Sequence, residues 1–336
     1  MSERILEVKD LRVSFDTYAG EVQAVRGVSF YVDKGETLAI VGESGCGKSV
    51  TVQTIMKLIS MPPGRIKSGS INYCGKDISG YTDKMMETIR GKEMSMIFQD
   101  PMTSLNPTMR IGRQIKEGIL KHTRINSKEA EEKAINLLRD VGIPDPDKSM
   151  IRYPHVFSGG MRQRIMISIA LACNPKILFA DEPTTALDVT TQSQILELMN
   201  ELKERLNTAI VLITHDLGVV ARMADRVAVM YAGKIVESGT ANDIFYSPKH
   251  PYTWGLLESL PSIDREKSNR LFMIPGSPIN LIDPPAGCSF ADRCKYSMYV
   301  CKKQEPTETQ INGTHSASCW LLDERAPEIS FKRGVI

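Results

Sequence analysis

No apolar run in this sequence approaches the roughly 18 residues needed to cross a bilayer. The longest mainly apolar stretch, residues 165–173, is about half that length. The N-terminus, MSERILEVKD, is charged and lacks the apolar core of a secretion signal. The net charge is only +2, so no basic field argues for a nucleic-acid partner. These absences predict a cytosolic protein without a membrane-spanning segment.

The composition of the 336 residues is that of an ordinary soluble protein, with 42% hydrophobic and 24% charged residues. This length suffices for one large domain and a smaller appendage. Four of the seven cysteines fall in the last fifth of the chain: Cys288, Cys294, Cys301 and Cys319. Disulfides are the least favoured explanation for them in a reducing cytosol.

Short apolar runs alternate with helical patterns, which predicts an α/β protein with a mostly parallel sheet. Residues 5–15 and 22–32 are β-rich and predict an antiparallel pair. Unbroken apolar runs indicate strands buried on both faces. They occupy residues 37–41, 176–180 and 209–213, the last two separated by a predicted helix at 190–206, and a hairpin is predicted at 226–237.

The middle of the chain, about residues 105–155, has helical periodicity. Ser127 is the predicted cap of one helix and Gly142 its predicted end. From about Pro248 prolines recur and periodicity fades, which predicts a domain boundary near 245–260.

The segment GESGCGKS at residues 42–49 matches the phosphate-loop pattern G-x-x-x-x-G-K-[ST]. Its glycines let the backbone approach phosphate, and consecutive N–H groups form an anion nest at a helix start. Lys48 is predicted to reach the β- and γ-phosphates, and the Ser49 hydroxyl to ligate Mg²⁺. The preceding buried strand and the helix predicted at 49–59 are the context that this loop requires.

Two further segments carry residues that could act on a nucleotide bound at this loop. The apolar strand ending in Asp181-Glu182 would place one carboxylate near Mg²⁺ and the next as a general base for water. Ser158-Gly159-Gly160 opens a predicted helix at 161–172 and offers a second anion-binding helix end.

The order of these motifs resembles the ATP-binding-cassette (ABC) family over about residues 5–260. The resemblance rests on the phosphate loop, Gln99, Ser158-Gly159-Gly160, Asp181-Glu182, the segment Thr185 to Asp188, and His215. It implies an ABC nucleotide-binding domain at 1–255, with an N-terminal antiparallel β subdomain and a helical subdomain at about 100–165. A small irregular extension would occupy 256–336. In that family two ATPases dimerise head to tail, and each ATP lies between the phosphate loop of one and the Ser-Gly-Gly helix of the other.

The resemblance also implies roles for single residues. Glu182, His215 and Gln99 would be catalytic, and Ser49, Gln99 and Asp181 would surround Mg²⁺. Either Phe15 or Tyr18 would stack on adenine. The other ATP-binding positions are Gly42, Glu43, Ser44, Gly45, Cys46, Gly47, Lys48, Ser49 and Val50. The contacts to the ATP of the partner are Ser158, Gly159, Gly160, Met161 and Asp188, with Met161 standing where the family often has glutamine.

The segments FQDPMTSLNP (residues 98–107) and HPYT (250–253) are similar to the dipeptide and oligopeptide importer branch. That branch implies an ATPase at the cytoplasmic membrane face, paired with a homologous second ATPase. The pair would dock on two permease subunits fed by an extracytoplasmic binding protein. Related importers of nickel or oligosaccharides share these features, so the cargo stays open.

The four late cysteines follow the pattern C-x5-C-x6-C-x17-C, which suits Zn²⁺ or an iron–sulfur cluster. The resemblance favours a structural [4Fe-4S] cluster over zinc or free thiols. Other functions fit less well. A DNA-repair or translation ABC protein would carry a long coiled coil or a second cassette. A kinase or GTPase would lack the Ser158 helix and His215, and a regulatory module would not need Glu182.

Overall fold

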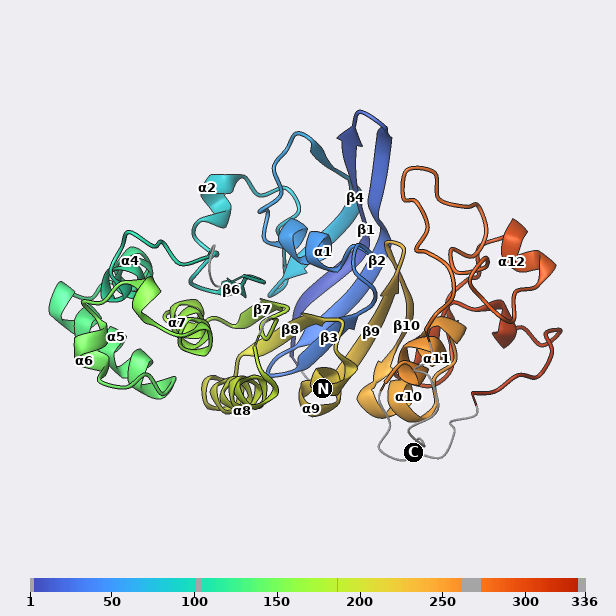
Figure 1. The fold of residues 1–336 in the computed structure, drawn as a ribbon. Coiled ribbons are helices and arrows are strands. Elements are labelled where there is room, and N and C mark those ends of the chain that lie inside the picture. The colour runs from blue at the N-terminus through green and yellow to red at the C-terminus, as the bar shows by residue number, and fades with distance from the viewer. Residues whose placement is uncertain (1–2, 101–103, 186, 261–272, 332–336) are drawn as a thin grey trace. The chain divides into compact units, whose positions relative to one another are not determined.

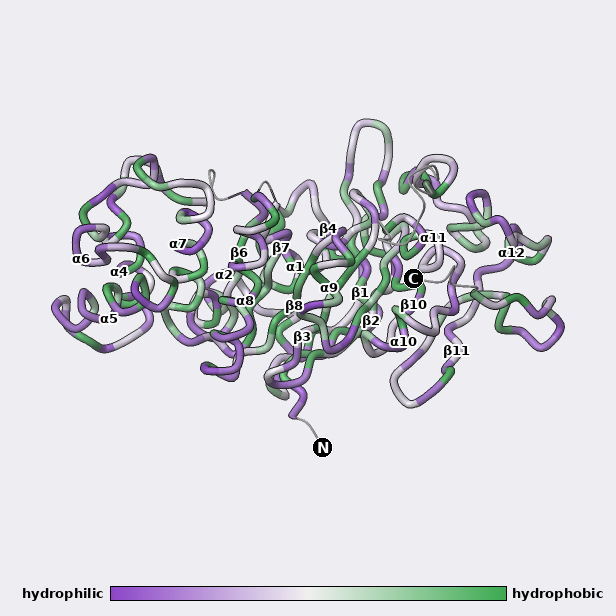
Figure 2. The backbone as a smooth tube through the Cα atoms, turned by 60° about the horizontal axis from the view of Figure 1, so that its bottom comes forward, coloured by the Kyte–Doolittle hydropathy of each residue, from purple (hydrophilic) through white to green (hydrophobic). Residues whose placement is uncertain are grey.

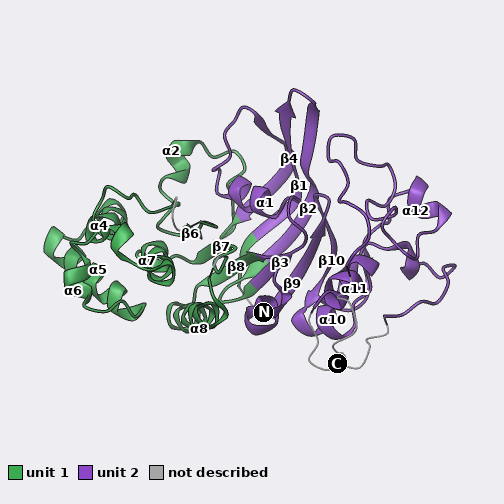
Figure 3. Ribbon diagram, in the orientation of Figure 1, with its two compact units in different colours: residues 1–6, 32–37, 73–213 green, residues 7–31, 38–72, 214–336 purple. Residues whose placement is uncertain are grey.

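The computed structural model describes residues 3–100, 104–185, 187–260 and 273–331. The chain forms two compact units (Figure 3). Unit 1 comprises residues 1–6, 32–37 and 73–213, and unit 2 comprises residues 7–31, 38–72 and 214–336. Each unit therefore collects segments that are distant in sequence. The proposed division at residue 255 is a different partition and stays a prediction.

Unit 1 contains a run of parallel strands in which β7 (Ile177–Asp181) lies between two others (Figure 1). On one side β7 pairs with β6 (Met94–Ile97), and on the other with β8 (Ala209–Thr214). All residues of these strands are buried. The prediction of two strands buried on both faces is confirmed. Asp181 is the last residue of β7, and Glu182 follows it directly.

The described helices of unit 1 are α2 (Asp83–Met86), α4 (Ile111–His122), α5 (Ser127–Asp140), α6 (Pro146–Ser149), α7 (Gly159–Leu171) and α8 (Val189–Leu206). Of these, α4 and α5 are amphipathic and bury one face. The predicted cap of α5 is wrong by one residue. Asn126 accepts hydrogen bonds from the N–H groups of Lys128 and Glu129, both at 3.0 Å, and Glu129 closes a capping box. Ser127 is instead the first helical residue, because the asparagine before it satisfies the free N–H groups.

Unit 2 contains most of two sheets. The long strands β1 (Arg4–Thr17) and β2 (Gly20–Asp33) are neighbours, and β4 (Gly64–Tyr73) follows β1 in that sheet. In the second sheet β3 (Thr37–Val41) pairs in parallel with β9 (Arg226–Tyr231). The strand β10 (Lys234–Thr240) then pairs antiparallel with β9 across the predicted turn at Ala232-Gly233, where both residues have positive φ.

The C-terminal segment adds strands to this second sheet. The short strand β12 (Ser316–Ala317) pairs with β10, and β11 (Thr309–Gln310) pairs with β12. In the described part of unit 2 the helices are α1 (Lys48–Ile55), α9 (Leu217–Met223), α10 (Ala241–Tyr246), α11 (Pro251–Glu258) and α12 (Tyr299–Lys303). The extension predicted after residue 255 therefore contains regular structure that joins the sheet, as well as irregular segments.

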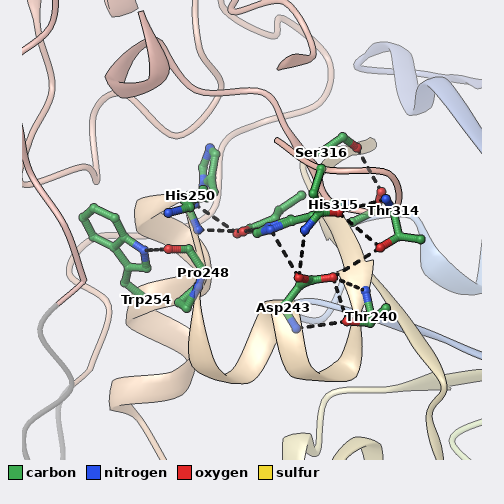
Figure 4. Close-up of polar contacts among 12 residues, drawn as sticks. Thr240, Asp243, Pro248, His250, Trp254, Thr314, His315 and Ser316 are labelled. Carbon is green, nitrogen blue, oxygen red and sulfur yellow. Dashed lines mark hydrogen bonds and ion pairs between the residues drawn. The ribbon is translucent and has the colours of Figure 1, made fainter. Parts of the chain in front are cut away.

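A buried polar cluster fastens β12 to β10 and α10 (Figure 4). His315 Nε2 lies 2.8 Å from Glu237 Oε1, and both side chains are about 1% exposed or less. The same carboxylate accepts hydrogen bonds from the backbone N–H groups of Lys249 and His250, at 2.6 and 3.0 Å. The Glu237 carboxylate therefore has partners for both oxygens, as a buried charge requires.

Hydrophilic stretches interrupt the hydrophobic ones throughout the chain, as the colouring of Figure 2 shows. Within the described ranges, no helix has both the length and the apolar character for crossing a membrane.

The hydrophobic core of unit 2 includes Tyr231, Tyr252 and Phe290, whose rings pack with centroids 4.7 to 5.3 Å apart. Phe290 comes from the extension, so the extension shares the core of this unit.

Candidate active site

The phosphate loop of unit 2 connects β3 to α1 and needs glycine at two crowded positions. Gly42 has φ of 156°, and a Cβ there would lie 2.1 Å from the carbonyl oxygen of Met230. Gly47 has φ of 103°, and a Cβ there would lie 2.3 Å from the carbonyl oxygen of Ala24. Any other side chain would have to displace backbone at both places. Gly45 also has positive φ but faces open space.

Lys48 is the first residue of α1, and its side chain turns back over the loop. Its Nζ donates hydrogen bonds to the carbonyl oxygens of Gly42 at 2.7 Å and Glu43 at 2.9 Å. The residue is 6% exposed, so these carbonyls provide the partners that a buried ammonium needs. Cys46 is also buried, and burial raises the pKa of its thiol. The loop thus offers a cation, backbone N–H groups and a helix start at one place.

Unit 1 brings two predicted catalytic residues into direct contact. Gln99 Nε2 donates a hydrogen bond of 2.9 Å to Glu182 Oε2, and Thr185 Oγ1 donates one of 3.0 Å to the same oxygen. Glu182 has φ of 47°, a backbone conformation uncommon for this residue type. Asp181 is 4% exposed and ends β7. A buried carboxylate followed by an oriented, half-buried one fits a metal ligand followed by a general base.

The predicted partner-contact residues also lie together in unit 1. Ser158 caps α7 and accepts a hydrogen bond from the N–H of Met161, while Asp188 caps α8 and accepts two from Thr191, at 3.0 and 2.7 Å. Those bonds, the backbone one first, lower the pKa of Asp188. A Cβ on Gly160 would lie 2.6 Å from Thr191 Cγ2. Glycine therefore lets the starts of α7 and α8 approach closely.

The structure also shows where the other predicted residues of unit 2 lie, but their positions do not distinguish between the roles predicted for them. Phe15 is half-buried in β1 beside Gly64, whereas Tyr18 is fully exposed at the turn between β1 and β2. His215 is exposed at the end of β8. Ser49 and Val50 are half-buried in the first turn of α1.

Two residues that contact the phosphate loop were missed by the sequence analysis. Tyr252 Oη accepts a hydrogen bond of 2.8 Å from the N–H of Glu43, and Arg293 forms an ion pair with the Glu43 carboxylate. They lie more than 200 residues from the loop in sequence, so no local pattern could indicate the contacts. The sequence analysis used the motif HPYT at residues 250–253 only for its similarity to the peptide-importer branch, and predicted no contact for Tyr252.

The four late cysteines are neighbours in unit 2, but their arrangement is not that of a preformed metal site. Burial first, and the other three thiols after it, raise the pKa of Cys319 to about 12. Burial likewise raises the pKa of Cys288 to about 11, with contributions from Cys301 and Cys294. Over the described ranges, no three or more His, Cys, Asp or Glu side chains are grouped as metal ligands. The described geometry does not support the predicted [4Fe-4S] cluster or a zinc site.

Comparison with known families and structures identifies the class of protein. Residues 25–185 match the family model described as ABC transporter. A solved chain described as a dimeric bacterial ABC transporter cassette has a TM-score of 0.63 and 25% identity, covering 70% of this chain and 98% of that one. The cbiO1 structure from Clostridium perfringens has a TM-score of 0.61 and 27% identity, covering 72% of this chain and 91% of its own.

Two relatives match over nearly the whole chain. The oligopeptide transport ATP-binding protein OppD of Bacillus subtilis is 59% identical over 97% of this chain and 91% of its own length. The dipeptide transport ATP-binding protein DppD of the same organism is 55% identical over 96% of both. This chain belongs to the ABC transporter family and is one of its ATPases. More particularly, residues 236–301 match the oligopeptide/dipeptide transporter C-terminal region.

Proposed function

We propose that this chain hydrolyses ATP to power the import of dipeptides or oligopeptides through partner permeases. The observation that carries the proposal is the joint presence of the cassette motifs and the C-terminal region shared with peptide-transport relatives. The phosphate-loop residues 42–50 would hold the triphosphate, with Lys48 on the β- and γ-phosphates. Phe15 or Tyr18 would contact adenine, and Ser49, Gln99 and Asp181 would surround Mg²⁺.

Glu182 is proposed as the general base that takes the proton of the attacking water. Its carboxylate oxygen is held by Gln99 and Thr185, which restricts its orientation before the reaction. His215 would contact the γ-phosphate. Because Gln99 would also contact Mg²⁺, its bond to Glu182 offers a direct route by which metal binding could reorient the base.

The chain is proposed to work as one of two different ATPases at the cytoplasmic membrane face. Ser158, Gly159, Gly160, Met161 and Asp188 would contact the ATP held by the phosphate loop of the second ATPase. The close approach of the α7 and α8 starts through Gly160 supports a common surface for these residues. Two permeases and an extracytoplasmic binding protein would complete the importer.

The test is Glu182→Gln in the transporter reconstituted with its partner proteins in vesicles. Glutamine keeps the shape of the side chain but cannot accept the proton, so we expect ATP turnover to fall by roughly 10²–10⁴-fold while ATP binding persists. Uptake of labelled dipeptides and oligopeptides should fall with it. Glu201→Gln, at an exposed position of α8, is the matched control.

Near-normal ATP hydrolysis in Glu182→Gln would refute the assignment of Glu182 as the general base. Uptake of nickel or an oligosaccharide by the unmodified transporter, without peptide uptake, would refute the assignment of peptides as the cargo.

We also propose that Cys288, Cys294, Cys301 and Cys319 hold a structural [4Fe-4S] cluster, with zinc as the alternative. The four thiols are mutual neighbours. The backbone N–H groups of Phe290, Tyr296 and Leu321 donate hydrogen bonds to Cys288, Cys294 and Cys319 respectively. Such donors stabilise thiolates, which are the ligand form. The ligands would have to move closer together, because the described arrangement is not preformed.

Metal analysis of the anaerobically purified chain tests this second proposal. We expect iron and acid-labile sulfide together with the visible absorption of an iron–sulfur cluster. Cys319→Ser should lower the metal content, whereas Cys74→Ser, at an exposed position of unit 1, should not. Zinc without iron would select the alternative, and a metal-free, colourless protein would refute both.

A further inference from the structure

The C-terminal extension carries an arginine whose main partner is the phosphate loop. Arg293 Nη1 and Nη2 lie 2.6 and 2.9 Å from the two carboxylate oxygens of Glu43, which is a bidentate ion pair. The Arg293 side chain is 6% exposed and that of Glu43 is 25% exposed. Two parallel bonds fix the orientation of the carboxylate as well as its charge. Both residues belong to unit 2.

The rest of the guanidinium is also held in place. Arg293 Nε donates to the carbonyl oxygen of Pro275 at 2.9 Å, and Nη2 donates to that of Ile274 at 3.4 Å. The guanidinium carbon lies 5.8 Å from the Tyr231 ring centroid and 5.9 Å from that of Phe290. An arginine with these partners is built into the core of the unit and is not a surface residue that happens to meet an acid.

A second contact holds the backbone of the same loop residue. Tyr252, which is fully buried, accepts a hydrogen bond of 2.8 Å from the N–H of Glu43. Tyr252 itself packs against Tyr231 and Phe290, the two rings that also flank Arg293. Glu43 is therefore held by its backbone and by its side chain, from one cluster that joins α11 to the extension.

We infer that Arg293 is a positioning residue for ATP binding, which orients Glu43 and neutralises its charge at the mouth of the phosphate loop. The inference rests on the proposed assignment of residues 42–49 as the triphosphate site. A free carboxylate at the second position of that loop would repel the anionic triphosphate and would be able to compete for Lys48. The extension then contributes to nucleotide affinity as well as to the stability of its own unit.

The experiment titrates the full-length chain with ATP in the presence of Mg²⁺, using calorimetry or a fluorescent ATP analogue. Arg293→Gln removes the neutralising charge and should raise the Kd for ATP by about tenfold. Adding Glu43→Gln to Arg293→Gln removes the uncompensated carboxylate, so the Kd should return to within about threefold of the unmodified chain. Arg293→Lys, with a point charge in place of the fork, should lie between the two.

Lys302→Gln is the matched control, since Lys302 is an exposed residue of the same extension paired loosely with Asp292 at 3.9 Å. In the assembled transporter, Arg293→Gln should raise the KM for ATP far more than it lowers kcat. The double variant stays informative even where Arg293→Gln folds poorly, because it buries no unpaired charge.

The possible outcomes separate the inference from the proposal on which it rests. Failure of the unmodified chain to bind ATP would refute the phosphate-loop assignment itself. ATP binding by the unmodified chain that is unchanged in Arg293→Gln would refute the inference alone. If Arg293→Gln weakens ATP binding and the added Glu43→Gln does not restore the Kd, Arg293 acts only through packing. That outcome would also overturn the inference.

Discussion

Two neighbouring histidines of unit 2 are buried in different ways. His315 Nε2 contacts the Glu237 carboxylate, whereas His250 Nδ1 accepts the backbone N–H of Tyr252 at 3.0 Å as the cap of α11. His250 is 1% exposed, and its burial lowers the pKa of the imidazole to about 4 against the opposing charge of Glu237. A proton on Nδ1 would remove the acceptor that the helix start needs.

The first prediction is a loss of stability when the pH falls from 6.5 to 4. The folded chain keeps His250 neutral in this window while the unfolded chain protonates it, so acid favours unfolding. The pKa difference corresponds to about 3 kcal/mol of unfolding free energy, present above pH 6.5 and lost as the pH falls through 4.

Urea denaturation at pH 4.5 and 7 measures this loss. His250→Asn keeps an acceptor suited to the cap but cannot titrate, so its decline with acid should be smaller. His155→Asn, at an exposed histidine, should decline like the unmodified chain. An equal decline for His250→Asn would contradict the assignment.

Individual residues were predictable where neighbours in sequence make the site. The loop from Gly42 to Ser49 is contiguous, so spacing alone indicated its chemistry. The contact of Gln99 with Glu182 joins two motifs 83 residues apart, and only the resemblance placed both near one site. The pair of Glu43 with Arg293 spans 250 residues and could not be predicted, because a lone arginine in a proline-rich extension has no pattern of its own.

At the element scale, the start of α5 distinguishes two adjacent capping residues. Asn126 accepts the N–H groups of Lys128 and Glu129, while Ser127 already has helical conformation. We predict that Asn126→Ala lowers the free energy of unfolding by about 1 kcal/mol. Ser127→Ala should have an effect near zero, since alanine is a good helix former inside the first turn.

Thermal or urea denaturation of the two variants decides between them, and each serves as the control for the other. A larger loss in Ser127→Ala would restore the sequence-based assignment. The error has a simple cause, because two capping residue types stand side by side and the pattern does not rank them. The strands were easier, since runs such as residues 177–180 and 209–213 are apolar throughout.

On the scale of the whole molecule, the C-terminal segment is part of unit 2 rather than an appendage without a core. Phe290 packs against Tyr231 and Tyr252, and β12 extends the sheet beside β10. The Glu237–His315 contact fastens the same segment from inside. Fading periodicity and recurring prolines predicted a domain boundary near residues 245–260, and that boundary stays a prediction. They could not reveal packing that depends on long-range contacts of single aromatic and charged side chains.

The last prediction concerns the pairing of this chain with a second ATPase. If Ser158 contacts the ATP of the partner, Ser158→Ala in the assembled transporter should reduce photolabelling of the partner subunit by azido-ATP about tenfold, the loss expected for one hydrogen bond to a charged group. Labelling of this chain should change little, because its own phosphate loop in unit 2 is intact.

Asn126→Ala, which removes a helix cap elsewhere in unit 1, controls for loss of a cap as such. Ser158 itself caps α7, so the variant also weakens that helix start by about 1 kcal/mol. A general loss of folding would lower the labelling of both subunits equally. Selective loss on this chain would place Ser158 at its own nucleotide and refute the head-to-tail arrangement.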